Sequence, residues 1–154
     1  MACDRPEITE RLTAHGLRAT PARCRILGLL LETHEHYTPE EMLEALRTRG
    51  EPMSIATLYQ NLAKLSEAGV IGRFVGPDGV SRYDAVTDPH HHLVCEVCGR
   101  MVDVRAAGPL AEVVPQAVFP EDAGELARWQ VKGHKVEFVG VCPACQARLR
   151  ARSA

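Results

Sequence analysis

The chain has 154 residues, of which 45% are hydrophobic and 25% are charged, and its formal net charge is −2. These values are typical of a globular protein that buries a core. No apolar run approaches the ~20 residues needed to cross a bilayer, and the start of the sequence lacks the apolar stretch of a signal peptide. We therefore expect a cytoplasmic protein without a membrane partner.

The charges are unevenly distributed along the chain. Residues 11–31 hold four arginines and no acid, residues 32–51 hold six glutamates, and residues 52–66 hold Lys64 and no acid. This segregation is expected if two segments face an anion and the third faces solvent. Chance clustering is the alternative explanation.

Three helices are predicted in the first half, within residues 19–32, 37–50 and 53–69. Their N-caps are predicted to be Thr20, Thr38 and Ser54, and proline follows the first two caps. Apolar residues recur at helical spacing in each segment. In the third helix these residues are Ile55, Leu58, Leu62 and Leu65.

The third predicted helix is informative because of its polar face. This face carries side chains that can reach base edges or phosphates, namely Thr57, Gln60, Asn61 and Lys64, with Tyr59 at its edge. A β-hairpin with a "GPDG" turn is predicted after it, within residues 70–84. Three helices and a hairpin are typical of a winged helix-turn-helix, although an ordinary solvated helix face gives the same polar pattern.

Two Cys-x-x-Cys pairs lie in the second half, at Cys95 and Cys98 and at Cys142 and Cys145. Two such pairs suffice for a tetrahedral structural zinc site, and a reducing compartment favours metal over disulfides. The alternative is a redox dithiol at "CPAC". That alternative requires the pair at the start of a helix that follows a strand, which the sequence pattern does not indicate. The remaining cysteines, Cys3 and Cys24, are expected to be inert.

Three consecutive histidines precede the first cysteine pair. In an extended strand His90 and His92 share one face, whereas His91 points to the other. Four thiolates saturate zinc, so these histidines predict a second metal site. Candidates to complete it are Asp84, Asp103 and His36. Nitrogen and oxygen ligands without thiolate suit Fe(II), Mn(II) or Zn(II).

The domain organisation follows from a change of pattern near residue 84. Short β-branched runs replace the helical periodicity, and residues 109–119 are predicted to form a helix interrupted by Pro115. We therefore expect an α+β protein, with a winged-helix domain in residues 1–84, a hinge in residues 85–89 and a small α/β domain in residues 90–154.

These motifs together resemble the ferric uptake regulator (Fur) family of metal-responsive transcription factors. The matching segments are "GLRATPAR", "HYTPEEM", "SIATLYQNLAKLSEAGVI", "RYD", "HHHLVCEVCGRMVD" and "GVCPAC". The resemblance covers about residues 10–148 and implies a homodimer that binds a palindromic double-stranded DNA operator, with residues 90–154 as the dimerisation domain. It implies that Arg18 lies near phosphate and that residues 54–65, from Ser54 onward, form the recognition helix, with Tyr59 near thymine methyls.

The resemblance also implies the ligands of each metal. Structural zinc is assigned to Cys95, Cys98, Cys142 and Cys145, and a regulatory Fe(II) or Mn(II) to His36, Asp84, His90, His92 and Asp103. A further site found in some members would use His91, Glu112 and His134 here. Pro89 occupies a position where another ligand of that site can stand.

The implied function is a non-enzymatic, metal-dependent repressor. Asp103 in "MVD" is similar to the peroxide-sensing (PerR-type) branch, in which Fe(II) and peroxide oxidise histidine ligands; here those would be His36 and His90. The alternative is an iron- or manganese-responsive uptake repressor without peroxide chemistry. Zinc sensing is disfavoured because the stretch "RYDAVTDP" lacks the cysteine ligand of zinc-uptake regulators.

Overall fold

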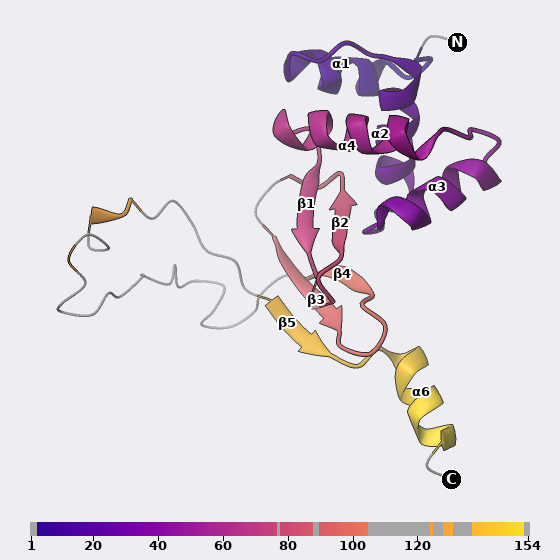
Figure 1. Cartoon of the computed structure of the whole chain (residues 1–154), viewed down its shortest axis with the longest axis vertical. Helices are drawn as coiled ribbons and strands as arrows, with labels where there is room; N and C mark the ends of the chain where they lie inside the picture. The colour runs from indigo at the N-terminus through magenta and orange to yellow at the C-terminus, as the bar shows by residue number, and fades with distance from the viewer. Residues whose placement is uncertain are drawn as a thin grey trace.

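The computed structural model describes residues 3–76, 78–87, 90–104, 124, 128–130 and 137–152. Its elements follow one another along a long axis: four helices, a two-stranded hairpin, a three-stranded sheet and a final helix (Figure 1). The N-terminal and C-terminal ends lie at opposite ends of this axis. The architecture confirms the predicted α+β class.

The first half is helical. Its helices are α1 (Pro6–Ala14), α2 (Pro21–Thr33), α3 (Pro39–Thr48) and α4 (Ile55–Glu67). The predicted N-caps are confirmed, because the side chains of Thr20, Thr38 and Ser54 each accept a backbone N–H three residues later. In α3, Glu41 completes a capping box with Thr38.

Helix α1 was not among the predicted elements. Pro6 stands at its first turn beside Glu7, which is the arrangement that favours helix initiation. Ile8 and Leu12 lie one turn apart and are both buried. These signals are present in the sequence, but they span few residues and only one apolar pair, which makes the periodicity weak.

One hydrophobic core joins the four helices to the base of the hairpin. Its largest members are leucines and isoleucines of α1, α2 and α4 together with Met42 and Leu46 of α3. The predicted apolar stripe of α4 is correct for Leu58, Leu62 and Leu65, which are fully buried. It is wrong for Ile55, which is 55% exposed. Ile55 is the first residue of α4, and its side chain lies beyond the end of the core.

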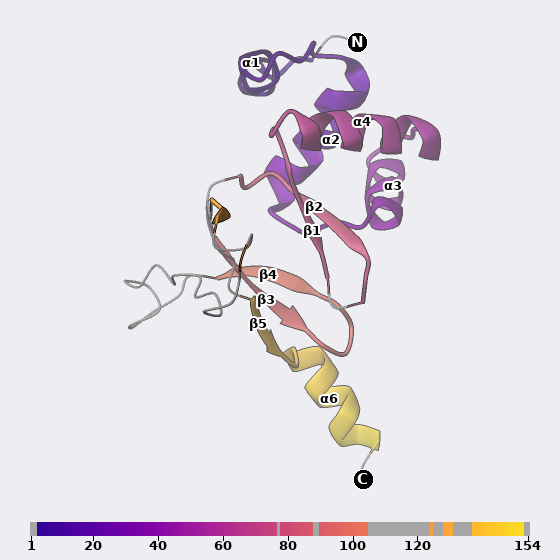
Figure 2. The ribbon, with the colours of Figure 1, turned by 60° about the vertical axis from the view of Figure 1, so that its left-hand side comes forward.

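The hairpin, called the wing below (residues 72–84), consists of β1 (Gly72–Val75) and β2 (Ser81–Asp84), which pair antiparallel. Alternation gives it two faces. Gly72 and Phe74 share one face with their partners Asp84 and Arg82, and Figure 2 shows the wing reaching from the helices to the second sheet. The opposite face carries Tyr83, and β2 contacts helices α2 and α3.

The second half contains a sheet of three strands in the order β4-β3-β5. These are β3 (His91–Cys95), β4 (Met101–Val104) and β5 (Glu137–Gly140), followed by helix α6 (Pro143–Arg152). Strand β3 pairs antiparallel with β4 and parallel with β5. The sequence predicts short β-branched runs at residues 91–95, 101–104 and 128–142, and strands β3, β4 and β5 fall within them. Helix α6 was not predicted, and the predicted helix at 109–119 lies outside the described residues. The domain boundary at residues 85–89 stays a prediction.

No helix in the described part of the chain is long and apolar enough to cross a membrane.

Candidate metal centres and nucleic-acid interface

The four cysteines of the two Cys-x-x-Cys pairs converge. Their sulfurs all lie within 4.8 Å of one another, and the sulfurs of Cys98 and Cys142 are 3.8 Å apart. Thiolates bound tetrahedrally at 2.3 Å from zinc are separated by about 3.8 Å. The donor set and its spacing therefore fit a zinc ion.

Hydrogen bonds from a backbone N–H and from an arginine side chain reach the sulfurs of this cluster. The Cys142 N–H donates to the Cys95 sulfur at 3.3 Å, and this bond is the main reason that the pKa of Cys95 is lowered to about 6. Burial raises the pKa of Cys145 to about 11. The Arg148 guanidinium donates to the Cys145 sulfur at 2.8 Å, which places a positive charge beside the thiols. Cys95 is thus disposed to offer a thiolate at neutral pH.

The sequence pattern did not indicate that "CPAC" stands at the start of a helix that follows a strand, and this prediction was wrong. Cys142 follows strand β5 after one residue, Val141, and Pro143 begins α6, so the pair does stand at a helix start after a strand. The strand lies within the β-branched run predicted at residues 128–142, but the helix was missed because α6 has a low apolar content. Its proximity to the first pair nevertheless places the dithiol in a four-sulfur cluster, which supports the metal interpretation.

A second cluster contains the five side chains predicted for the regulatory metal. One ligand atom from each of His36, Asp84, His90, His92 and Asp103 lies within 4.8 Å of the others. His36 Nε2 is 2.9 Å from Asp84 Oδ2 and 3.1 Å from Asp103 Oδ1. Ligands at about 2.1 Å from one ion and at right angles are about 3.0 Å apart. Both His36 Nε2 and Asp84 Oδ2 are buried without a hydrogen-bond partner among the described residues, which fits atoms directed at an ion.

Two strand pairings build this cluster. Tyr37 and Tyr83 form an isolated antiparallel bridge with N–H···O distances of 3.1 and 2.9 Å. The bridge sets His36, from the loop before α3, opposite Asp84 at the end of β2. In the second sheet, His92 and Asp103 are direct cross-strand partners. Each pairing thus brings one histidine and one carboxylate together, and His90 joins them from just before β3.

Neighbouring groups orient the ligands. The Val86 N–H donates to Asp84 Oδ1 at 3.1 Å, which leaves Oδ2 to face the histidines. Arg11 of α1 donates to the carbonyl of Val70 at 2.8 Å and also to that of Ala85. Sequence reasoning missed Arg11, because nothing in the local pattern links α1 to the residue after Asp84.

Phe74 of the wing is a second neighbour that was missed. Its ring centroid lies 4.2 Å from that of His92, 5.6 Å from that of His90 and 5.9 Å from that of His36, each in an edge-on arrangement. Gly72 makes room for it, because a Cβ there would lie 2.8 Å from both the Phe74 ring and Asp84 Oδ1. The aromatic ring therefore covers one side of the cluster.

The protonation state of His92 suits a ligand. Burial, reinforced by the nearby His36 and His90, lowers the pKa of His92 to about 4. A neutral imidazole at physiological pH keeps its lone pair available for a metal.

The further site implied by the resemblance lies largely outside the described residues. His91 points away from the five-ligand cluster, as the alternation predicted, and its ring stands 6.3 Å from that of Phe138. Glu112 and His134 are not among the described residues. That site stays a prediction.

The side chains predicted for DNA lie on or beside α4. Gln60 and Lys64 are exposed, and Asn61 is half-buried with its amide donating to the Thr57 carbonyl at 2.8 Å. The hydroxyls of Ser54 and Thr57 lie 2.8 Å apart at the start of the helix. Arg18 is exposed in the segment before α2. The N-terminal turn of α4 also exposes Ile55, an apolar group suited to a thymine methyl.

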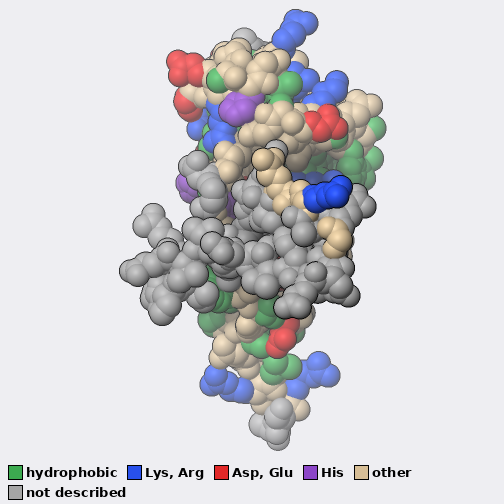
Figure 3. All heavy atoms as spheres, turned by 90° about the vertical axis from the view of Figure 1, so that its left-hand side faces the viewer, with side chains coloured by type: hydrophobic (Ala, Val, Ile, Leu, Met, Phe, Trp, Pro, Cys, Tyr) green, Lys and Arg blue, Asp and Glu red, His purple; other side chains and the backbone are tan. Residues whose placement is uncertain are grey.

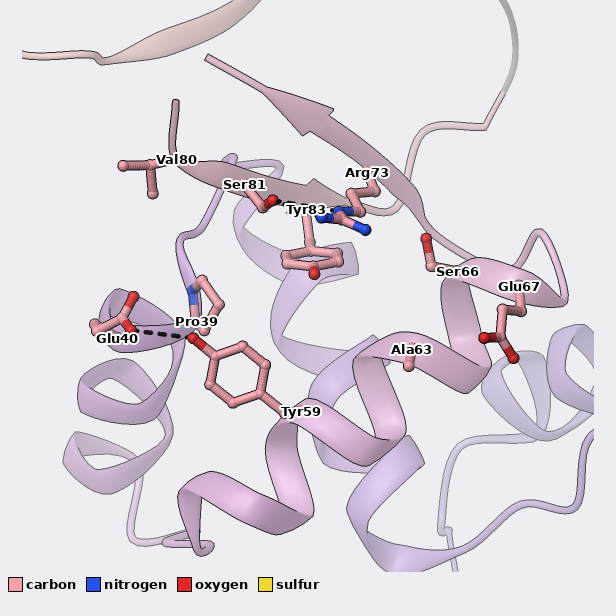
Figure 4. A pocket seen from close by; sticks show the side chains of 10 residues that line it. All are labelled: Pro39, Glu40, Tyr59, Ala63, Ser66, Glu67, Arg73, Val80, Ser81 and Tyr83. Atoms are coloured by element: carbon pink, nitrogen blue, oxygen red, sulfur yellow. Dashed lines mark hydrogen bonds between the residues drawn. The ribbon is translucent and has the colours of Figure 1, made fainter. Parts of the chain in front are cut away.

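Tyr59 is held at the rim of a hollow of about 560 Å³ between α3, α4 and the wing (Figure 4). Its hydroxyl donates to Glu40 Oε1 at 3.2 Å, and burial together with this carboxylate raises the pKa of Tyr59. Across the hollow, Arg73 donates to the Ser81 hydroxyl at 3.1 and 3.2 Å. Glu40 thus fixes the direction of a predicted DNA-contacting ring.

Basic side chains gather at the two ends of the face shown in Figure 3. Lys and Arg side chains lie over the helical end, and others lie near the C-terminus. The last turn of α6 carries Arg150 and Arg152. Positive charge at the helical end accompanies the predicted DNA contacts.

A winged helix joined to a small sheet that carries one four-sulfur and one histidine–carboxylate cluster defines a metal-responsive DNA-binding regulator. The model of the ferric uptake regulator family matches residues 14–118. The chain belongs to this family.

Relatives named for peroxide regulation are similar over most of the chain. The peroxide operon regulator of Bacillus subtilis is 35% identical over 142 residues, which cover 92% of this chain and 93% of that protein. The peroxide-responsive repressor PerR of Staphylococcus epidermidis is 34% identical over 131 residues, which cover 85% and 83%.

Solved structures show the same fold. The ferric uptake regulator of Vibrio cholerae aligns with a TM-score of 0.66 at 27% identity, over 87% of this chain and 98% of that one. A zinc-bound manganese uptake regulator aligns with a TM-score of 0.63 at 27% identity, over 88% and 98%. The predicted family and fold are confirmed.

Proposed function

We propose that this protein is a peroxide-sensing repressor that binds its operator when the histidine–carboxylate cluster holds Fe(II) or Mn(II). The observation that carries the proposal is the composition of that cluster. His36 comes from the helical part, Asp84 from the end of the wing, and His90, His92 and Asp103 from the second sheet, yet their ligand atoms lie within 4.8 Å of one another.

Because the ligands come from both halves, metal affinity and domain arrangement are linked. Two carboxylates held this close repel each other unless a cation stands between them. The positive charge of a bound metal ion offsets the repulsion between the two carboxylates. The arrangement that brings all five side chains together is then favoured, and it fixes where α4 and the wing stand relative to the sheet. Such linkage is typically worth ~1–3 kcal/mol between metal and DNA.

The DNA side of the proposal assigns α4 to the major groove. Thr57, Tyr59, Gln60, Asn61 and Lys64 would face the bases and backbone, with Ser54 and Arg18 near phosphate. The operator is double-stranded and palindromic in this proposal, because two copies of the chain bind it as a homodimer. An exposed apolar side chain on the second sheet, Leu93 at 38% exposure, supports a dimer interface there.

The four cysteines have a different role. Cys95, Cys98, Cys142 and Cys145 would hold structural Zn(II), which supplies a cross-link between the loop after β3 and the start of α6. Four thiolates leave no open position for a substrate, so we assign no enzymatic activity to this site.

Peroxide sensing is proposed from the relatives named as peroxide regulators at 34–35% identity. A bound Fe(II) would promote cleavage of the O–O bond of hydrogen peroxide, with peroxide as the two-electron oxidant of the imidazole. One oxygen atom would be inserted into a C–H bond of the His36 or His90 ring, and the other would leave as water. An oxidised imidazole is a poorer ligand, so the cluster loses its cation and the operator is released.

The test is mass spectrometry of protein loaded anaerobically with Fe(II) or Mn(II) and then exposed to hydrogen peroxide. We expect one added oxygen on the His36 or His90 peptide with iron and none with manganese. Unmodified peptides together with metal-dependent operator binding would favour a metal-uptake repressor instead. That second function is supported by the structural similarity to a manganese uptake regulator.

A further inference from the structure

An ion pair between a buried arginine and a partly exposed aspartate, 7% and 39% exposed, lies where the wing meets the sulfur cluster. Arg82 of β2 donates through Nη1 to Asp78 Oδ1 at 3.0 Å and through Nη2 to Asp78 Oδ2 at 2.7 Å. The two parallel hydrogen bonds form a planar fork, called the Asp78–Arg82 fork below. The Arg82 side chain is 7% exposed, and the fork lowers the pKa of Asp78 to about 2.

Two glycines enclose this fork, one from each half of the molecule. A Cβ built on Gly76 of the wing would lie 2.5 Å from Arg82 Nη1 and 2.7 Å from Asp78 Oδ1. A Cβ built on Gly99 would lie 2.5 Å from Arg82 Nη2 and 2.8 Å from Asp78 Oδ2. Any side chain at either position would collide with the fork, so the fork is seated directly on both backbones.

Gly99 closes the turn that carries the first cysteine pair, called the cysteine turn below (residues 95–99). Its N–H donates to the Cys95 carbonyl at 2.8 Å, and its φ of +71° is a conformation that favours glycine. The Cys98 thiol lies close enough to Arg82 to contribute to the raised pKa of this guanidinium. The backbone that holds the cysteines is therefore the surface on which the wing rests.

The enclosed position separates this ion pair from ordinary surface pairs of the same chain. Arg47 and Glu44 of α3 also form a two-bond fork, at 2.9 and 2.6 Å, but their side chains are 70% and 62% exposed. An exposed pair of that kind contributes little to stability. A fork enclosed between two backbones has a cost when it is broken, because Arg82 is left buried without its partner.

We propose that the Asp78–Arg82 fork docks the wing on the cysteine turn, so that the four-cysteine site positions the wing for DNA in addition to holding the second sheet. The inference rests on the proposed function, which assigns the wing to a DNA-binding domain and the cysteines to zinc. The five-ligand cluster lies at the base of the wing, beside Asp84, whereas the fork lies near its turn. The wing is thus fixed at two separate points.

The experiment uses the full-length, zinc-loaded protein. Asp78→Asn removes the charge and one acceptor of the fork with almost no change in shape, and Arg82→Lys keeps the charge but cannot form the fork. Glu44→Gln is the matched control, because it makes the same change in the exposed fork of α3. Hydrogen–deuterium exchange of the wing amides is measured without DNA, zinc content is measured for each variant, and operator affinity is measured separately.

For Asp78→Asn and Arg82→Lys we expect full zinc content, at least about fivefold faster exchange in residues 75–82 and operator binding weakened by about fivefold or more. Removing zinc from the wild type should speed wing exchange similarly, and removing it from Asp78→Asn should add little. Glu44→Gln should match the wild type in every measurement.

Wing exchange in both fork variants that equals that of Glu44→Gln would overturn the proposal, as would wing exchange in the wild type that does not respond to zinc removal. A fork variant that loses zinc would also contradict it, because the fork would then be required for the cysteine site itself. Failure of the wild type to bind any operator would count against the proposed function alone, since the exchange measurement needs no DNA.

Discussion

The two metal clusters are built from different parts of the chain. All four cysteines lie within the second half, on the turn after β3 and at the start of α6. The five other ligands are divided between the loop before α3, the end of β2, the residue just before β3, and the strands β3 and β4. A site confined to one half can stabilise that half in every state, whereas a site shared by both halves stabilises one arrangement of them. This difference separates a structural metal from a regulatory one.

The largest effect is expected at the confined site. Cys142→Ser removes one thiolate but keeps the backbone N–H that donates to the Cys95 sulfur, so it tests the thiolate itself. Structural zinc contributes about 10 kcal/mol or more of folding free energy in small domains, so we expect loss of zinc and unfolding or monomerisation of the second half. Metal analysis and analytical ultracentrifugation test this. A folded, dimeric, zinc-free protein that has only lost activity would instead point to a redox or catalytic dithiol.

The next effect is expected at the shared site. His36→Asn should leave the protein folded, with zinc bound, but weaken both regulatory-metal and operator affinity by about tenfold or more. His34→Asn is the control, because His34 is an exposed histidine two residues away and outside the cluster. Calorimetry with Mn(II) and fluorescence anisotropy with operator DNA measure the two affinities. A change in Mn(II) affinity without a change in operator affinity, or the reverse, would show that the shared site does not link metal binding to DNA binding.

A smaller effect is expected at Phe74, which covers the shared site without being a ligand. Edge-on ring pairs are worth about 1 kcal/mol, so Phe74→Ala should weaken Mn(II) binding by about fivefold. Val75→Ala provides a control on the same strand, since Val75 is 58% exposed. Equal Mn(II) affinity in the two variants would show that the ring has no part in holding the histidines.

The smallest functional effect is expected at Cys24, a thiol outside both clusters. Burial, together with the adjacent Cys3, raises the pKa of Cys24 to about 12. At pH 8 its thiolate fraction is then about a thousandfold below that of an ordinary thiol, and alkylation in the native protein should be slow to the same degree. Cys24→Ala should leave zinc content and operator affinity unchanged. Rapid native alkylation of Cys24 would contradict its assignment as an inert core residue.

Much of the helical half could be predicted because its signals are local. Caps such as Thr38 with Glu41 and the leucine spacing of α4 act within one or two turns. The types of metal ligand could also be predicted, because the spacing of Cys-x-x-Cys and of alternating histidines is typical of metal sites. The contacts of Arg11, Phe74 and Gly99 were not, because each connects segments far apart in sequence. Their partners become neighbours only after the wing has packed against the second sheet.

The bridge between Tyr37 and Tyr83 has a consequence for how this protein can vary. It consists of backbone hydrogen bonds, so replacing either tyrosine side chain leaves the N–H and C=O groups in place. Adding one residue between His36 and Tyr37 is different, because it would turn the imidazole to the opposite side of the pairing or shift it by one position. Sensing is therefore more tolerant of substitution at Tyr37 or Tyr83 than of an insertion beside Tyr37.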